Sequence, residues 1–153
     1  MQIEKQVCTI KQAYRLQELG IDGHLSVFSF ARYLPDPTGQ HEGYTIVMDS
    51  DHRLAGVCEQ LAPAFTVAEL GVMLPHPDNI SEIGGWVHLS EFDSSPNEKR
   101  PWYLIWEFER KESHERKLID GDTEAEARAD MLIYLLENNI VTATDCNTRL
   151  NEN

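Results

Sequence analysis

The chain has 153 residues, of which 41% are hydrophobic and 25% charged, and its formal net charge is −13. The length suits one domain, and the apolar fraction excludes a disordered chain. The longest apolar run covers residues 131–136, whereas a membrane-spanning helix needs about 20 such residues. The charge argues against a protein that binds nucleic acid by neutralising phosphates. We therefore expect a soluble, acidic domain that contacts neither a membrane nor nucleic acid directly.

The cysteines and the two ends of the sequence indicate the compartment. The N-terminal residues contain no basic segment followed by an apolar one, so we expect no secretory signal. Cys8, Cys58 and Cys146 lie far apart and form neither a C-x-x-C pair nor a disulfide framework. This pattern predicts a reducing cytoplasm, with Cys58 acting as a small buried hydrophobe. The polar last residues are expected to fray.

In the first part of the chain, Thr9 is the expected N-cap of a helix. Gly20 is expected to end that helix, because glycine enters the left-handed backbone region at low cost. Aromatic and branched residues predict a strand at 25–30 and a second strand at 44–48, paired as a hairpin. Residues 34–43, with two prolines and two glycines, are the loop between them.

Two helices are expected next. The first is predicted by four apolar residues spaced for one helical face: Leu54, Val57, Cys58 and Leu61. Residues 49–51 would cap this helix, and Pro63 would end it. Thr66 and Glu69 form a capping box, in which each side chain binds a backbone N–H at the start of the second helix. Pro75 follows its end.

In the second part of the chain, the sequence pattern predicts two strands and two helices. The strands cover residues 86–92 and 101–110, and the alternation in the second strand places four side chains in the core: Trp102, Leu104, Trp106 and Phe108. Thr123 and Glu126 form a second capping box at the start of a long helix. Thr142 caps a short helix that runs to about residue 150.

The order of elements is therefore α, β, β, α, α, β, β, α, α. Paired strands between helices favour antiparallel pairing over a parallel β-α-β sheet. The expected fold class is α+β, an antiparallel sheet of about four strands with four to five helices packed on it. We expect one domain over residues 1–153.

The acidic residues are concentrated in the middle of the sequence. Residues 36–97 carry ten acidic residues and one basic residue, Arg53, whereas residues 98–121 carry six of each. A long segment with one cation suits a partner protein with a basic surface. The simpler alternative is that acidity keeps the protein soluble.

One pattern is compatible with a metal site. The strand at 44–48 is followed by Asp49 and Asp51, which could present two carboxylates to a divalent cation, with His52 beside them. Arg53, however, stands where a phosphatase of the aspartyl-nucleophile type has Thr or Val. In the alternative interpretation Asp51 simply caps a helix. Asp49, Asp51 and His52 are thus weak metal candidates, and we expect no cofactor and assign no catalytic residue.

The remaining motifs give weaker indications of a catalytic or binding site. The six histidines form neither H-x-x-x-H nor H-E-x-x-H, and no serine lies in a G-x-S-x-G turn. Residues 99–111 mix aromatic and basic side chains, as binders of single-stranded nucleic acid do. Because those aromatics alternate and the cations lie at the ends, a core strand with charged edges is the favoured interpretation.

Three stretches together, residues 9–21, 64–75 and 123–150, resemble a family of small uncharacterised phage and prophage proteins, especially those of gut Bacteroidetes. The resemblance covers about a third of the chain. It implies an accessory protein encoded by a mobile element and working in a bacterial cytoplasm. It implies no activity.

These observations predict a non-enzymatic accessory protein that binds a host or phage protein with a basic surface through its own acidic surface. A sharper version is a DNA mimic that inhibits a host factor. The alternative is a divalent-metal-dependent enzyme with a site near Asp49 and Asp51. A third hypothesis is single-strand binding through residues 99–111.

Overall fold

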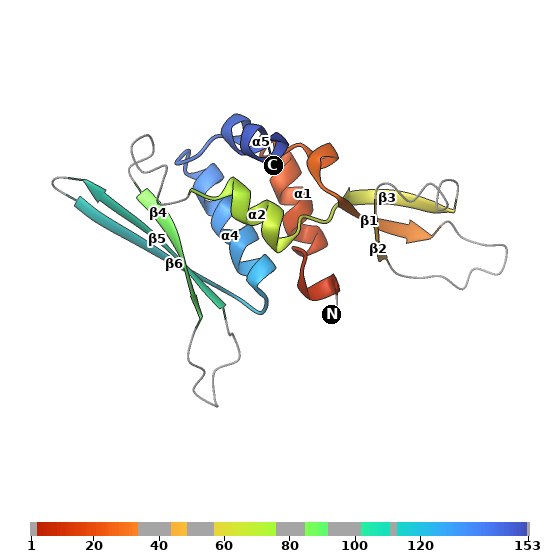
Figure 1. Ribbon diagram of the computed structural model, residues 1–153, viewed down its shortest axis with the longest axis horizontal. Coiled ribbons are helices and arrows are strands. Elements are labelled where there is room, and N and C mark those ends of the chain that lie inside the picture. The colour runs from red at the N-terminus through yellow and green to blue at the C-terminus, as the bar shows by residue number, and fades with distance from the viewer. Residues whose placement is uncertain are drawn as a thin grey trace, which may run out of the picture.

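The computed structural model describes residues 3–33, 44–48, 57–75, 85–91, 102–110 and 113–152. Its α-helices gather at the centre, with one β-sheet on each side of them (Figure 1). The described helices are α1 (Ile10–Glu18), α2 (Val67–Met73), α4 (Glu124–Glu137) and α5 (Ala143–Asn151). The helices therefore form the centre of the molecule, and any functional site is positioned by these helices and the two small sheets.

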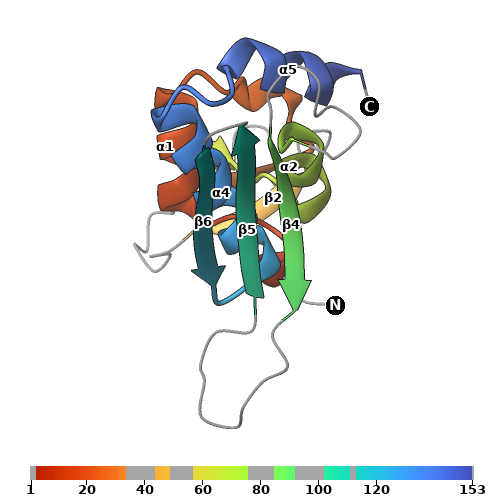
Figure 2. The same ribbon diagram turned by 90° about the vertical axis from the view of Figure 1, so that its left-hand side faces the viewer.

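Both sheets have three antiparallel strands. The first has the order β2-β1-β3 and is made of β1 (Phe28–Tyr33), β2 (Thr45–Met48) and β3 (Cys58–Pro63). The second has the order β4-β5-β6, faces the viewer in Figure 2, and is made of β4 (Gly85–Glu91), β5 (Trp102–Arg110) and β6 (Ser113–Gly121). The α+β class and the antiparallel pairing are confirmed. The expected single sheet of about four strands is wrong, because the strands divide between two sheets with helices between them.

The helix predicted from Leu54, Val57, Cys58 and Leu61 is wrong where the structure describes it. Residues 58–63 form β3, which pairs with β1 from Tyr33 opposite Cys58 to Ser29 opposite Pro63. A helical spacing of apolar residues arose here by coincidence, and the long-range pairing with β1 decides the conformation. Residues 49–56 lie outside the described ranges.

Strand β6 was not predicted. Its sequence is rich in charged residues, and Arg116, Lys117 and Leu118 are exposed. Such composition is typical of an edge strand, which charged side chains protect from pairing with other chains. Lys117 places its Nζ 5.1 Å from the centre of the Tyr134 ring on α4, so this cation also joins the edge strand to the helix.

The predicted starts of α1, α2, α4 and α5 are confirmed, and so is the end of α1. Thr9 and Thr66 each form a complete capping box, and Thr142 caps α5. Gly20 follows α1 with a φ of +95°, a conformation that glycine adopts readily. At α4 the box is incomplete in one detail. Thr123 accepts the Glu126 N–H, but the Glu126 carboxylate accepts from the N–H of Asp122.

Helix α4 forms the centre of the core. It packs against α1 and α2 and also against β5 and β6. Its buried residues occur around most of its circumference: Ala125, Ala127, Ala129, Met131, Leu132, Leu135 and Leu136. A helix that is apolar on most sides is expected in the middle of a core, not at its surface.

The cysteines differ from expectation at one position. All three are free, as predicted, but Cys58 is half-buried, whereas Cys8 and Cys146 are fully buried. Cys58 begins β3 at the end of the small sheet that lies away from the helices, and this position leaves it partly exposed (Figure 1). In the described part of the chain, no helix is long and apolar enough to cross a membrane.

Glu69 links two parts of the fold. Its carboxylate accepts the N–H of Thr66 at 2.6 Å and the N–H of Val27, just before β1, at 2.8 Å. We expect Glu69→Ala to lower the free energy of unfolding by about 1–2 kcal/mol, because a cap and a tertiary hydrogen bond are lost together. Urea unfolding measures this change. Glu152→Ala, at an exposed site after α5, is the control, and equal stability of the two variants would contradict the assignment.

Candidate functional site

A cavity of about 340 Å³ lies where the end of α1 meets the small β2-β1-β3 sheet. One wall is the chain from α1 through the 3₁₀ helix η2 (Gly23–Leu25), and the other wall is formed by β1 and β3. Its polar lining residues come from both walls: Gln17, Asp22, His24, Ser29 and Gln60. The cavity thus brings a carboxylate, a histidine, a hydroxyl and two amides together with the apolar residues Ile21, Leu61 and Ala62.

The loop after α1 is held by helix α5. Ile21 donates its N–H to Leu16 O at 3.0 Å and buries its side chain. On either side of Ile21, Asn147 of α5 makes two hydrogen bonds. Its Oδ1 accepts the Asp22 N–H at 2.9 Å, and its Nδ2 donates to Gly20 O at 3.0 Å. A single amide thus clamps the loop through its backbone.

Asp22 in turn sets the position of His24. The Asp22 carboxylate accepts the His24 N–H at 3.0 Å and caps η2. Space at Gly23 is limited, since a Cβ there would lie 2.9 Å from Gln17 Nε2 and 3.2 Å from Pro63 Cγ. A larger residue here would therefore require the Gln17 side chain and the Pro63 ring to shift.

A β-bulge shapes the opposite wall. Phe30 pairs with Ala62, but the next residue, Ala31, pairs with Gln60, which leaves Leu61 as the extra residue of β3. Gln60 and Leu61 both line the cavity. The bulge adds a residue to the β3 wall of the cavity, where the four consecutive residues 60–63 all contribute to the lining.

The other side of the small sheet is apolar. Phe28 lies opposite Met48 and Phe30 opposite Ile46, so these four side chains share one side. The Phe30 and Tyr44 rings meet edge to face at 5.4 Å between centroids. Tyr44 is 57% exposed and Met48 48% exposed. Phe30 itself is buried in the core, so only the outer part of this side, at Tyr44 and Met48, presents apolar and aromatic surface to solvent.

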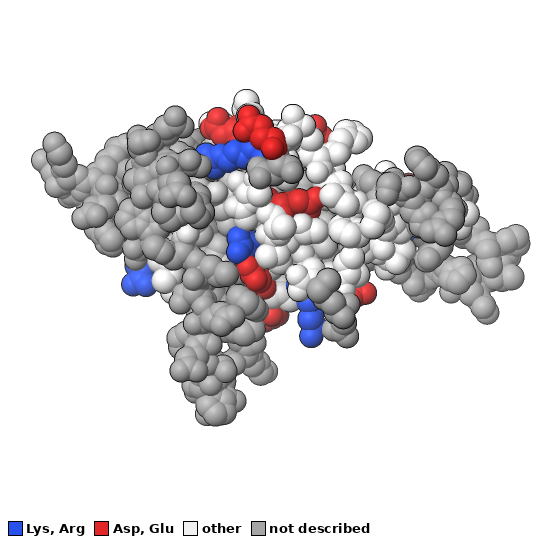
Figure 3. Space-filling model, viewed as in Figure 1, with Lys and Arg blue, Asp and Glu red and all other residues white. Residues whose placement is uncertain are grey.

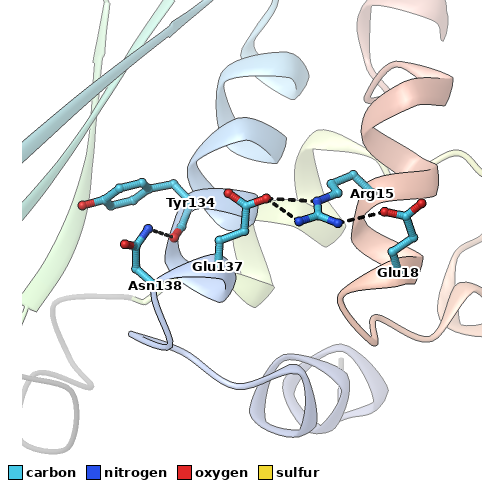
Figure 4. A network of polar contacts seen from close by, with 5 residues as sticks. All are labelled: Arg15, Glu18, Tyr134, Glu137 and Asn138. Atoms are coloured by element: carbon cyan, nitrogen blue, oxygen red, sulfur yellow. Dashed lines mark hydrogen bonds and ion pairs between the residues drawn. The ribbon is translucent and has the colours of Figure 1, made fainter.

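Acidic side chains of the helical centre are engaged in internal contacts. Arg15 of α1 binds Glu137 of α4 at 2.7 Å and Glu18 at 2.9 Å (Figure 4). The hydrogen bonds that the Arg15 guanidinium donates to Glu137 and, to a smaller extent, to Glu18 raise its pKa. Asn138 closes the same helix end by donating to Tyr134 O at 2.8 Å. Figure 3 shows basic and acidic side chains interspersed over the described surface in view.

Further carboxylates behave in the same way. Three of them hold a cation or an amide at 2.6–2.7 Å: Asp130 on Gln12, Glu124 on Arg128, and Glu59 on Arg32. Of the acidic segment 36–97, the structure describes the side chains of Glu59 and Glu69, and both have internal partners. The described part of the chain thus offers no support for regularly spaced carboxylates that imitate DNA phosphates.

The other residues predicted as sites are placed as follows. Asp49, Asp51 and His52 lie outside the described residues. Within the described ranges, no group of three His, Cys, Asp or Glu is arranged to hold a metal ion. In the segment 99–111, Leu104 and Trp106 are buried, as predicted for a core strand; the side chains of Trp102 and Phe108 are not described.

Both buried thiols are unsuited to nucleophilic chemistry. Burial raises the pKa of Cys8 to about 12 and that of Cys146 to about 11. Because the thiolate is the nucleophile, both groups are unreactive near neutral pH. Cys146 instead donates to Met73 O at 3.7 Å, a contact between α5 and α2.

Sequence reasoning missed the cavity. Its walls come from segments about 40 residues apart, and the bulge at Leu61 has no local pattern. The available signal was Gly23, a second glycine three residues after the one that ends α1. It marks a place where the side chains of Gln17 and Pro63 come close to the loop, but it does not indicate from the sequence which segment approaches.

Comparison with family models, with curated protein sequences and with solved structures finds no match to this chain. The resemblance to phage and prophage proteins therefore stays a prediction.

The clamp made by Asn147 can be tested directly. We expect Asn147→Ala to lower the free energy of unfolding by about 1–2 kcal/mol, because two hydrogen bonds are lost. Hydrogen exchange at the Asp22 amide should become faster. Asn151→Ala, at the exposed end of the same helix, is the matched control. An unchanged Asp22 amide in Asn147→Ala would contradict the clamp.

The raised thiol pKa values predict a pH dependence. From pH 9 upward the unfolded thiols, with a pKa near 9.0, lose protons that buried Cys8 and Cys146 retain up to about 12 and 11. Stability contributed by the neutral thiols is complete below pH 9 and is lost as pH rises above it, by at most about 1.4 kcal/mol per unit for each thiol.

We therefore expect a smaller loss of stability between pH 9 and 11 in the Cys8→Ala/Cys146→Ala double variant than in the unmodified protein. Urea unfolding under reducing conditions measures both slopes, and the difference cancels the titration of other groups. Identical slopes would show that the thiols are not protected by burial.

Proposed function

We propose that this chain is a non-enzymatic accessory protein, of the kind carried by phages and prophages, that acts by binding another protein. The observation that carries the proposal is the apolar side of the β2-β1-β3 sheet. It exposes about half of Tyr44 and Met48 beside the partly buried Phe28 and Ile46. Isolated exposed apolar residues are ordinary, but neighbouring ones on a single sheet side favour an interaction surface.

The composition of this side suits protein binding. Tyr and Met are enriched at the centres of interfaces, where charged residues are depleted. Arg32 continues the same side of β1, and its ion pair with Glu59 at 2.6 Å lies at the margin of the apolar surface. An apolar centre with a polar margin is the usual arrangement of an interface.

Charge supplies the preference for a partner. A net charge of −13 attracts proteins with a basic surface over distances of about a Debye length, ~8–10 Å at physiological salt. Because many of the described carboxylates already have internal partners, we assign the acidic residues the role of long-range attraction and assign the contact itself to the apolar sheet side. This division is common, since complementary charge raises association rates more than affinity.

The proposal predicts which substitution abolishes binding. Burying a Tyr or Met side chain contributes about 1.5–3 kcal/mol, so Tyr44→Ser/Met48→Ser should weaken partner binding at least about tenfold. The measurement is retention of a bacterial partner on the tagged full-length chain, followed by titration with the purified partner. Raised salt should slow its association.

The matched control is Leu118→Ser, which removes an apolar side chain of similar exposure, 50%, from the other sheet. It should retain the partner. Circular dichroism of each variant confirms folding. Equal retention by the double variant, or equal loss in the control, would contradict the proposed surface.

A further inference from the structure

The outer edge of strand β2 borders the apolar sheet side. We propose that the partner contributes an extended segment, which pairs with this edge as an additional antiparallel strand of the β2-β1-β3 sheet. The segment carries apolar side chains at alternate positions and basic side chains between them. This inference rests on the proposed function, because it specifies how the partner covers the apolar side.

Strand β2 forms one of the two edges of the small sheet. In the described part of the chain, β1 is the one strand that pairs with it. The other edge, β3, is approached by α1 and η2. A Cβ on Gly23 of η2 would lie only 3.2 Å from Pro63 Cγ on β3. The described elements therefore restrict access to β3 more than access to β2.

The hydrogen bonds of β1 show which of its backbone groups point to β2. Phe28 O accepts the N–H of Ala64 at 2.7 Å, so the backbone groups of Phe28 point to the β3 side. Those of Phe30, two residues later, point the same way, because backbone groups alternate along a strand. The backbone groups of Ser29 and Ala31 therefore point to β2.

On β2, the same alternation directs every second residue outward. The two β1 residues that face β2 lie opposite Val47 and Thr45, whose backbone groups are thus directed to β1. The N–H and C=O groups of Ile46 and Met48 are then directed outward from the sheet. Both residues carry their side chains on the apolar side. Residues of an added strand that bond to them place their own side chains on that same side.

The composition of β2 also favours strand addition. Its sequence, Thr-Ile-Val-Met, contains no charged residue and no proline, which are common protections of an edge strand. Edge strand β6, in contrast, exposes Arg116 and Lys117. In strand addition, main-chain hydrogen bonds give affinity and alternate side chains give specificity. The apolar side therefore selects apolar residues at every second position of the added segment.

Charge favours a basic segment over a second copy of this chain. Strand β2 lies within residues 36–97, which carry ten acidic residues and one basic residue. Two copies of the chain, each with a net charge of −13, repel each other. A segment with Lys or Arg between its apolar residues is attracted instead. The occupant of the edge is thus a basic, extended segment of another protein.

The test uses the full chain and synthetic peptides. The probe is acetyl-Lys-Val-Lys-Val-Lys-Val-Lys-amide, which has the proposed alternation. Amide NMR spectra recorded during its addition should show saturable shifts over Thr45–Met48. Hydrogen exchange at the amides of Ile46 and Met48 should slow at least about tenfold in the complex, because these N–H groups gain hydrogen-bond partners.

Two peptides methylated at backbone nitrogens are the matched pair. The valines of the probe bond to β2, so methyl groups on the three valine nitrogens remove the donors that face β2. This change should weaken binding at least about tenfold. Methyl groups on three lysine nitrogens point away from β2 and should leave binding unchanged. A peptide with Glu in place of each Lys should also bind at least about tenfold more weakly.

Four results would overturn the proposal. They are the absence of saturable shifts over Thr45–Met48, unchanged exchange at Ile46 and Met48, equal binding of the two methylated peptides, and equal binding of the glutamate peptide. Protection of the same two amides that rises with protein concentration, in the absence of peptide, would also overturn it and would indicate a second copy.

The proposed function is judged separately, by partner retention in Tyr44→Ser/Met48→Ser. If this variant loses the partner but the probe does not bind the unmodified chain, the apolar side binds its partner without strand addition. If the variant retains the partner, the proposed function fails, whatever the peptides show. The two failures are therefore distinguishable.

Discussion

The close packing of α4 is the constraint on which the rest of the structure depends. Its three alanines at 125, 127 and 129 let neighbouring elements approach the helix axis, while Leu132 and Leu135 fill the space farther along. Helices α1 and α2 and strands β5 and β6 all bury surface against it. Gln12 of α1 adds a polar contact, because its Nε2 donates to Glu126 O at 3.1 Å and to Asp130 at 2.7 Å. The orientation of α1 follows from these contacts.

The candidate sites lie at the edge of this core and depend on it indirectly. Helix α5 is anchored by the buried Cys146 and Leu150, and the residue between them that faces the loop, Asn147, holds the backbone beside the cavity. The small sheet is joined to the same core through Phe30 and Ala62. The sheet is therefore fixed to the core, and the outer part of its Phe30 side keeps apolar surface exposed at Tyr44 and Met48. The core thus positions both surfaces and contributes Ile21 to the cavity and Phe30 to the apolar side.

Local signals made the helix starts predictable, and long-range pairing made the sheets hard to predict. Thr66 and Glu69 lie three residues apart, so the local sequence alone is enough to predict the capping box that they form. Strand β3 depends on β1, some 30 residues away, and its apolar spacing imitates a helix. Polar β6 forms because β5 offers it a partner. The cavity requires a bulge, a turn and a clamp from three distant segments, which no single stretch reveals.

The most direct test of this account is native-state hydrogen exchange of the full chain. Because α4 is enclosed by helices and a sheet, its amides from Glu124 to Glu137 should exchange most slowly, through global unfolding alone. Those of β2, Thr45–Met48, at the edge of the small sheet, should exchange through local opening at a much lower free energy. Equal exchange in α4 and β2 would contradict the central claim that a rigid helical core carries a separate, less stable sheet.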